Sequence, residues 1–296
     1  MTNVVPTLRQ WLQQPLITSP LPGFEAHAQV LRLDQLDPIL SGNKAYKLLG
    51  HIEQFHQSGY SALLSFGGRH SNHLHALAAF GARWHCPTVG IVLGYPEQPL
   101  TPTLLDCQQL GMSLQFVDRA TYAKRYQPAW HRQLAQQFDA YVMGEGGEGE
   151  PGLRGCRLLA PYVQQYAEVW LPVGTGTTAL GLASVLPLGT KLVGVNAIAD
   201  RGAQQARWQT LLDNRSWRLL DQYHAGGFAR ITDTLRSLIQ HYDDKQLPLD
   251  PVYTAKLVWA FEQEWAAGRV HSPVLLLHTG GLQGRRGYDL PAWRGQ

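Results

Sequence analysis

The chain has 296 residues, of which 44% are hydrophobic and 16% charged, and its formal net charge is +3. This composition predicts a packed globular protein, either one large domain or two modest ones, and excludes a disordered chain. The basic residues are scattered rather than gathered into a dense patch, so we expect no nucleic-acid partner.

Three widely separated cysteines, Cys86, Cys107 and Cys156, favour reduced thiols in the cytoplasm over a disulfide framework. The cysteines and histidines lack the spacing of a zinc site, so no metal is expected. Polar residues interrupt the N-terminal region where a signal peptide needs an apolar run. No apolar stretch approaches the ~20 residues of a membrane span, so we expect no membrane partner.

Hydrophobic periodicity predicts alternating strands and helices in the first half of the chain. The strands are expected over residues 61–66, 88–93, 113–117 and 140–143. The helices are expected over residues 47–59, from residue 74, and over residues 103–110 and 129–138. This βα repetition predicts a parallel sheet with helices on its faces.

The segment GEGGEGEPG, residues 144–152, is the richest in glycine, and we interpret it as a crossing between two lobes rather than a surface linker. The alternation resumes beyond it, which supports this interpretation. Further strands are expected over residues 169–173, 191–198 and 274–278. Further helices are expected over residues 153–166, from residue 179, and over residues 235–242 and 253–267.

Three polar, glycine-rich turns follow predicted strands: GGRHSN at 67–72, GTGTT at 174–178 and HTGG at 278–281. Open α/β sheets bind ligands at the carboxyl ends of their strands, so these turns and Lys44 could line one cleft. GTGTT offers backbone N–H groups, hydroxyls and a following helix to an anion. The turn matches neither a P-loop nor GxGxxG, so a nucleotide is not indicated. It either binds a small ligand with a terminal phosphate or is an ordinary strand-to-helix turn.

Lys44 directly follows Gly-Asn in the stretch SGNKAYKL and precedes an apolar helix. A solvated surface charge is the ordinary interpretation of a single lysine. Together with a phosphate cradle, however, it suggests pyridoxal phosphate, which needs an amine for a Schiff base, a phosphate anchor and a partner for its ring nitrogen. Partial desolvation would lower the pKa of the amine enough for it to act as a base.

Five motifs in order resemble the fold-type-II pyridoxal-phosphate enzymes, which are tryptophan synthase β-like. They are SGNKAYKL, GGRHSN, GTGTT, DPVYTAK and HTGG. More narrowly, the chain is similar to the 1-aminocyclopropane-1-carboxylate deaminase / D-cysteine desulfhydrase family over about residues 30–281. We expect a two-domain α/β protein with open parallel sheets and helices on both faces. The large cofactor-binding domain would comprise residues 1–47 and 147–296, and the small domain residues 48–146.

The resemblance implies that Lys44, rather than Lys47, carries the cofactor. Asn72 would hydrogen-bond the ring hydroxyl of the cofactor, and Ser71 would hold the substrate carboxylate or assist proton transfer. The residues expected to bind the phosphate are Thr175, Gly176, Thr177 and Thr178.

The resemblance also places Tyr253 near the substrate and Thr279 beside the pyridine nitrogen. A neutral hydroxyl there would favour β-elimination over deeper electron withdrawal. The family's deaminases tend to have Glu and Leu where this chain has Thr254 and Thr279, whereas its desulfhydrases favour small hydroxyl residues. The preferred activity is therefore conversion of D-cysteine to pyruvate, ammonia and sulfide. Deamination of 1-aminocyclopropane-1-carboxylate, or action on another small amino acid, is the alternative enzyme activity.

Departures from the family pattern keep a non-catalytic pyridoxal-phosphate-binding protein open as another function. Phe228 is the nearest candidate where the family often supplies a second active-site tyrosine, and a phenyl ring exchanges no proton. Glu148 and Glu150 replace small polar residues. A plain nucleotide-binding α/β domain is a third hypothesis, and it would give colourless protein. The resemblance further suggests a homodimer.

Overall fold

The computed structural model describes residues 4–271 and 273–291, and the chain folds into two compact units. Unit 1 contains Met1–Gln14 and Lys44–Gly155, and unit 2 contains Pro15–Asn43 and Cys156–Gln296. Each unit has a sheet of mainly parallel strands with helices on both faces, so the predicted fold class is confirmed. The boundaries of two separate folding domains, at residues 47/48 and 146/147, stay a prediction.

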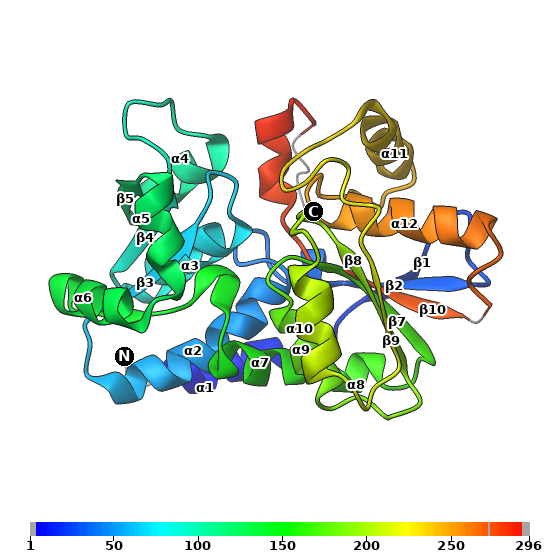
Figure 1. Ribbon diagram of the computed structural model, residues 1–296, viewed down its shortest axis with the longest axis horizontal. Helices are drawn as coiled ribbons and strands as arrows, with labels where there is room; N and C mark the ends of the chain where they lie inside the picture. The colour runs from blue at the N-terminus through cyan, green and yellow to red at the C-terminus, as the bar shows by residue number, and fades with distance from the viewer. Residues whose placement is uncertain (1–3, 272, 292–296) are drawn as a thin grey trace. The chain divides into compact units, whose positions relative to one another are not determined.

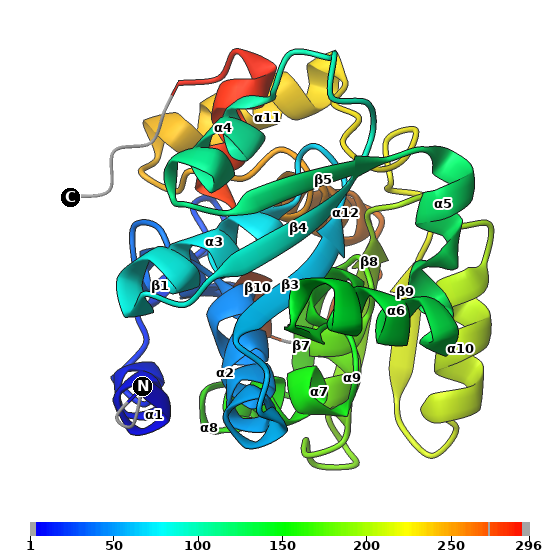
Figure 2. The ribbon, with the colours of Figure 1, turned by 90° about the vertical axis from the view of Figure 1, so that its left-hand side faces the viewer.

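Unit 1 is built on a four-stranded parallel sheet in the order β5-β4-β3-β6. Figure 2 shows β5, β4 and β3 side by side. The four strands are β3 (Ala62–Gly67), β4 (Thr88–Leu93), β5 (Ser113–Val117) and β6 (Ala140–Val142). Sequence periodicity predicted all four, two of them to the residue. The central strands β3 and β4 are almost wholly buried, as continuous apolar runs in a parallel sheet should be.

Helices cover both faces of this sheet. They are α1 (Val4–Leu12), α2 (Asn43–Ser58), α3 (Asn72–Trp84), α4 (Pro102–Gln109), α5 (Arg119–Ala123), α6 (Pro128–Phe138) and α7 (Glu150–Arg157). Phe66 of β3 packs with Tyr122 of α5 and Leu134 of α6 on one face. Leu74 of α3 lies against Gly90 of β4 on the other. The sequence prediction missed α1 and the one-turn helix α5.

Helices α2 and α7 approach each other closely enough for backbone contact. A Cβ on Gly50 would lie 1.9 Å from the carbonyl oxygen of Pro151, and one on Gly155 would lie 1.8 Å from that of Tyr46. Glycine is therefore required at both positions, because any side chain would force the two backbones apart.

Unit 2 contains a six-stranded sheet in the order β1-β2-β10-β7-β8-β9 (Figure 1). Its strands are β1 (Thr18–Pro20), β2 (Ala28–Arg32), β7 (Glu168–Val173), β8 (Lys191–Asn196), β9 (Trp217–Leu220) and β10 (Val274–His278). Of these six strands, only the edge strand β1 is antiparallel to its neighbour. The parallel strands direct their carboxyl ends toward one edge, which is where the glycine-rich turns begin.

The helices of unit 2 also lie on both faces of its sheet. They are α8 (Ala160–Val163), α9 (Thr177–Ala183), α10 (Ala203–Leu211), α11 (Asp233–Asp244) and α12 (Thr254–Ala266). Phe261 of α12 meets Trp170 of β7 edge-on, with ring centroids 5.7 Å apart. Trp208 of α10 packs on Gly194 of β8. The neighbouring residue Val193 faces the other side of the sheet, because successive strand residues point to opposite faces. Within residues 4–271 and 273–291, every helix is too short or too polar to cross a bilayer.

The contact between α2 and α7 gives a first testable prediction. Gly155→Ala should lower the free energy of unfolding by about 1–3 kcal/mol, because the new methyl group overlaps a backbone oxygen that cannot rotate away. Gly189→Ala is the matched control, since a Cβ there meets nothing within 4 Å. Urea unfolding followed by circular dichroism measures both variants, and equal midpoints would show that the helices separate at no cost.

Candidate active site

The turn GTGTT joins β7 to α9 in unit 2, and two side chains of α10 donate hydrogen bonds to its carbonyl oxygens. Gln204 donates from its side-chain nitrogen to Gly174 O at 3.1 Å, and Arg207 donates to Thr175 O at 3.0 Å. Gly176 has φ +79°, and a Cβ there would lie 2.7 Å from Oε1 of Gln204. The carbonyl oxygens of the turn are therefore engaged by α10, and its conformation requires glycine at residue 176.

The start of α9 supplies the donors that a phosphate needs. The first hydrogen bond of this helix runs from Leu180 N to Gly176 O at 2.9 Å, so the N–H groups of residues 177–179 have no acceptor within the helix. Thr175 Oγ1 and Thr177 Oγ1 lie 3.0 Å apart, which gathers two hydroxyls at the same turn. The predicted phosphate residues are thus brought together on one backbone loop.

Asn43, the residue before Lys44, is buried and is hydrogen-bonded to two of the predicted cofactor segments. Its Nδ2 donates to Thr178 Oγ1 at 2.8 Å, and its backbone N–H donates to Thr279 O at 3.4 Å. Gly42 has φ +74°, and a Cβ there would lie 2.0 Å from Thr279 O. Asn43, which directly precedes Lys44 in the chain, is therefore bound to both segments within unit 2.

Thr279 lies at the carboxyl end of β10 in a turn that His278 fixes. The Nε2–H of His278 donates to Pro248 O at 2.7 Å, and its Nδ1 accepts from Gly280 N at 3.2 Å. An Nδ1 that accepts carries no proton, so its 3.5 Å approach to Asp34 Oδ1 is not an ion pair. Asp34 instead takes a two-point contact from Arg32.

Tyr253 is positioned by the start of α12. The carboxylate of Asp250 accepts from the backbone N–H groups of Val252, Tyr253 and Thr254 at 3.1, 3.1 and 2.6 Å. The phenol of Tyr253 then lies against the GTGTT turn, because a Cβ on Gly174 would be 3.2 Å from its hydroxyl oxygen. Unit 2 therefore brings Tyr253 to the predicted phosphate residues.

Unit 1 contains the other three predicted residues: Lys44, Ser71 and Asn72. Lys44 is the second residue of α2 and is half-buried. Ser71 is the N-cap of α3, and its Oγ accepts from Leu74 N at 3.2 Å, which leaves the hydroxyl proton available for donation. A Cβ on Gly67 would lie 2.5 Å from this Oγ, so the glycine makes room for the serine.

His73, the second residue of α3, is buried within unit 1. The Nε2 of His73 lies 2.9 Å from Ser65 Oγ. Burial lowers the pKa of His73 well below its usual value, and the charges of Lys47 and Lys44 lower it further. His73 is therefore neutral at neutral pH.

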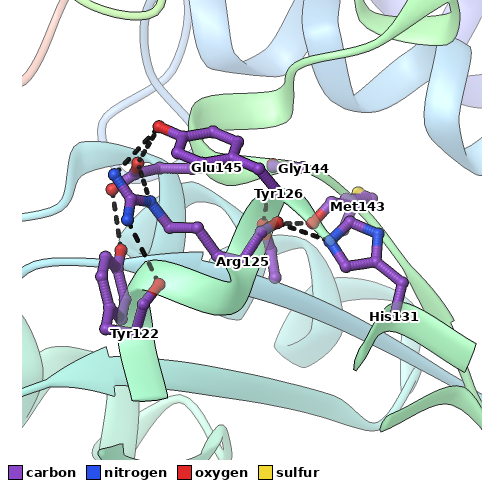
Figure 3. Close-up of polar contacts among 8 residues, drawn as sticks. Tyr122, Arg125, Tyr126, His131, Met143, Gly144 and Glu145 are labelled. Carbon is purple, nitrogen blue, oxygen red and sulfur yellow. Dashed lines mark hydrogen bonds and ion pairs between the residues drawn. The ribbon is translucent and has the colours of Figure 1, made fainter. Parts of the chain in front are cut away.

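The glycine-rich segment interpreted as a lobe crossing is fixed within unit 1. Lys47 donates to Gly146 O at 3.0 Å, and its burial is explained by this contact. Figure 3 shows the carboxylate of Glu145 bound by Arg125 Nε and the hydroxyl of Tyr122, each at 2.7 Å. Sequence analysis singled out Glu148 and Glu150 in this segment and missed Glu145, which has no recognisable motif.

Within unit 2, the structure brings Tyr253 and Thr279 to the GTGTT turn or to its partner Asn43, while Lys44, Ser71 and Asn72 belong to unit 1. The roles assigned to them stay predictions. In the described part of the chain, no group of three or more His, Cys, Asp or Glu side chains is arranged to hold a metal ion. Sequence reasoning missed Asn43, Gln204 and Arg207, whose contacts join residues far apart in the chain.

Comparisons with known proteins bear on the resemblance. No family model matches the chain. It is 25% identical over 287 residues to a protein of Thermotoga maritima provisionally named 1-aminocyclopropane-1-carboxylate deaminase, covering 88% of this chain and 90% of that protein. It is 26% identical over 288 residues to the D-cysteine desulfhydrase of Salmonella choleraesuis, covering 85% and 86% of the two chains.

A solved structure described as an ACC deaminase homologue has the same fold. It superposes with a TM-score of 0.76 at 18% identity and covers 94% of this chain and 96% of its own. The predicted resemblance is confirmed: this chain is a distant homologue of proteins named 1-aminocyclopropane-1-carboxylate deaminase and D-cysteine desulfhydrase, and it shares the fold of an ACC deaminase homologue.

Proposed function

We propose that this chain is a pyridoxal-phosphate-dependent lyase that removes a β substituent and ammonia from a small amino acid, with D-cysteine as the preferred substrate. The balanced reaction is D-cysteine plus water giving pyruvate, ammonia and hydrogen sulfide. The enzyme class and the cofactor agree with the homologues, one of which is named D-cysteine desulfhydrase. The resemblance also supports D-cysteine, because this chain has Thr254 and Thr279 where the family's deaminases tend to have Glu and Leu.

The observation that carries this proposal is the pair of hydrogen bonds made by Asn43. They join the residue before the candidate lysine to Thr178 of the phosphate turn and to Thr279. A pyridoxal-phosphate site needs an amine, a phosphate cradle and a group for the ring nitrogen, which are the three features that these contacts connect.

The residues present fit the cofactor. Gly176 is a turn position that a Cβ would fill, and Thr175 and Thr177 present their hydroxyls at the same turn. The turn carries no cation of its own apart from Arg207 behind it, so phosphate binding would rest mainly on backbone N–H groups. When bound, pyridoxal phosphate supplies an electron sink that stabilises negative charge at the substrate Cα.

The chain's own residues then have separate tasks. Lys44 would hold the cofactor, and its amine would take the proton from the substrate Cα. Ser71 retains a hydroxyl proton for the substrate carboxylate, while Asn72 would orient the ring hydroxyl of the cofactor. Tyr253 would contact the substrate from its position over Gly174.

Deamination of 1-aminocyclopropane-1-carboxylate is the second candidate, and the name of the Thermotoga maritima relative favours it. Thr254 argues against it, since this buried side chain offers no carboxylate beside Tyr253. We further propose that the enzyme is a cytoplasmic homodimer. Its buried thiols at Cys86, Cys107 and Cys156 suit a reducing compartment.

Replacing the lysine tests the proposal directly. Lys44→Ala should abolish the yellow colour near ~410 nm, which arises from the lysine–cofactor bond. It should also lower pyruvate release from D-cysteine by about 100-fold or more, because a positioned base is lost. The exposed Lys245→Ala should change neither. Colour and turnover that survive in Lys44→Ala would contradict the proposal.

Borohydride reduction followed by peptide mass mapping identifies the attached residue in the unaltered protein. The expected result is a pyridoxyl group on Lys44 and none on Lys47. An adduct on another lysine, or the lack of any adduct, would contradict the assignment of Lys44.

The Asn43 contacts give an independent prediction. Gly42→Ala should weaken pyridoxal phosphate binding by about tenfold or more, because a Cβ at this position overlaps Thr279 O and breaks a buried hydrogen bond. Gly23→Ala is the control, since Gly23 also has a positive φ, +85°, but a Cβ there meets nothing within 4 Å. Fluorescence titration of apoprotein measures the affinity. Equal weakening in both variants would assign the effect to backbone strain alone.

A further inference from the structure

The loop between β9 and α11 presents an aromatic side chain beside Tyr253. Phe228 is 41% exposed, and its ring centroid lies 6.4 Å from that of Tyr253 at an interplanar angle of 60°. The backbone before it has positive φ at Gly226 and Gly227, +88° and +120°. Two successive glycines with positive φ fix the direction of the chain just before Phe228, so the position of this exposed phenyl ring is specified by the loop.

Lys256 fixes this loop from below. It is fully buried, and its Nζ donates to Gly227 O at 2.7 Å and to Ala197 O at 2.9 Å. Lys256 lies in the first turn of α12 and Tyr253 is the N-cap residue of this helix, so the start of α12 positions both the tyrosine and the loop that carries Phe228.

The second acceptor, Ala197, links Lys256 to the phosphate turn. Ala197 N donates to Val173 O at 2.9 Å, and Val173 is the residue directly before GTGTT. The ammonium therefore connects the loop of Phe228 to the ends of β7 and β8. Desolvation lowers the pKa of Lys256 to about 8, and the negative charge of Asp250 partly offsets this by raising the pKa. The amine is therefore mostly charged at neutral pH.

Burying an ammonium costs free energy that two carbonyl contacts only partly offset. A methionine or leucine would fill the same volume more cheaply if packing were the only requirement. The buried charge is explained if its role is to hold Gly227, and with it Phe228, at one position relative to Tyr253.

We propose that Phe228, held beside Tyr253 by Lys256, is a specificity-determining residue that favours substrates with a thiol leaving group over those with a hydroxyl. This inference rests on the proposed lyase function. In the reaction that it selects, the substrate Cα would give its proton to the Lys44 amine and the freed electron pair would form a Cα–Cβ double bond. The Cβ–S bond would break, and its electron pair would leave on sulfur as hydrosulfide.

The selectivity follows from the chemistry of the phenyl ring. Phe228 has no hydrogen-bonding group, so a substrate hydroxyl placed against it loses water without gaining a partner. Sulfur makes favourable contacts with aromatic rings and is weakly hydrated. A tyrosine at this position would supply the missing hydrogen bond and relax the discrimination.

The first experiment compares D-cysteine with D-serine in two variants. Phe228→Tyr should lower the ratio of kcat/KM for D-cysteine over D-serine by about fivefold, the value of one hydrogen bond, chiefly through faster turnover of D-serine. Phe228→Leu keeps an apolar side chain without the ring. It should lower kcat/KM for D-cysteine by about 2- to 10-fold and leave D-serine nearly unchanged.

The outcomes separate the two proposals. A wild-type protein that releases pyruvate from neither amino acid overturns the lyase function and this inference together. An active wild type whose ratio stays within about twofold in Phe228→Tyr overturns only the role of Phe228. Because the side chain is 41% exposed, both variants are expected to fold.

The second experiment tests Lys256 as a positioning residue. Lys256→Met should speed hydrogen–deuterium exchange over residues 224–230 and lower the D-cysteine to D-serine ratio. The exposed Lys245→Met, on the segment after α11, is the control and should change neither. In a Phe228→Ala background, Lys256→Met should no longer alter the ratio, since coupled residues are not additive.

Equal effects of Lys256→Met with and without Phe228 would overturn the positioning role. If Lys256→Met fails to fold, Lys256→Gln provides the same comparison, because its amide keeps donors for one carbonyl. The Phe228 variants test the specificity role regardless of the outcome at Lys256.

Discussion

The hydrogen bonds of Asn43 are the contacts on which the candidate site depends. A buried side-chain amide that lost its hydrogen-bond partners would cost free energy. Asn43 therefore stabilises one arrangement of residues 41–43 relative to Thr178 and Thr279. Gly42 permits that arrangement, because its positive φ and missing side chain let the joint meet Thr279 O. The residue before Lys44 is therefore held in one backbone position, which suits the proposed role of Lys44 as the cofactor-binding lysine.

Helix α12 organises the substrate side of unit 2 in a comparable way. Asp250 begins the helix, Tyr253 lies over the phosphate turn and Lys256 reaches the loop of Phe228. Asp250 and Tyr253 lie just before α12 and Lys256 lies in its first turn, so the start of this helix fixes the positions of all three side chains. The motif DPVYTAK thus has a physical basis beyond family resemblance, and its lysine is explained by burial against carbonyl oxygens.

How much could be predicted from sequence depended on the range of the interactions. Strands such as 274–278 are continuous apolar runs, and their bounds were predicted to the residue. β9 has three half-buried residues and was missed, since a partly exposed strand lacks that pattern. The start of α2 lies four residues earlier than expected, at Asn43, because its first turn is fixed by contacts with Thr178 and Thr279. No local signal encodes such contacts.

The motifs predicted which residues gather at each strand end, but they could not specify the substrate. Apart from Lys44 and Asn72, the proposed cofactor contacts use backbone groups and hydroxyls that many fold-type-II sequences could supply. Discrimination between thiol and hydroxyl requires a side chain that differs in hydrogen-bonding capacity. Phe228 is one of the positions where this chain departs from the pattern that the resemblance suggests, and it replaces a phenol with a phenyl ring. Its effect depends on a buried ammonium 28 residues further along the chain, at Lys256. Specificity in this fold therefore resides in a loop whose position is set by the helix beneath it, while the cofactor chemistry resides in the strand ends.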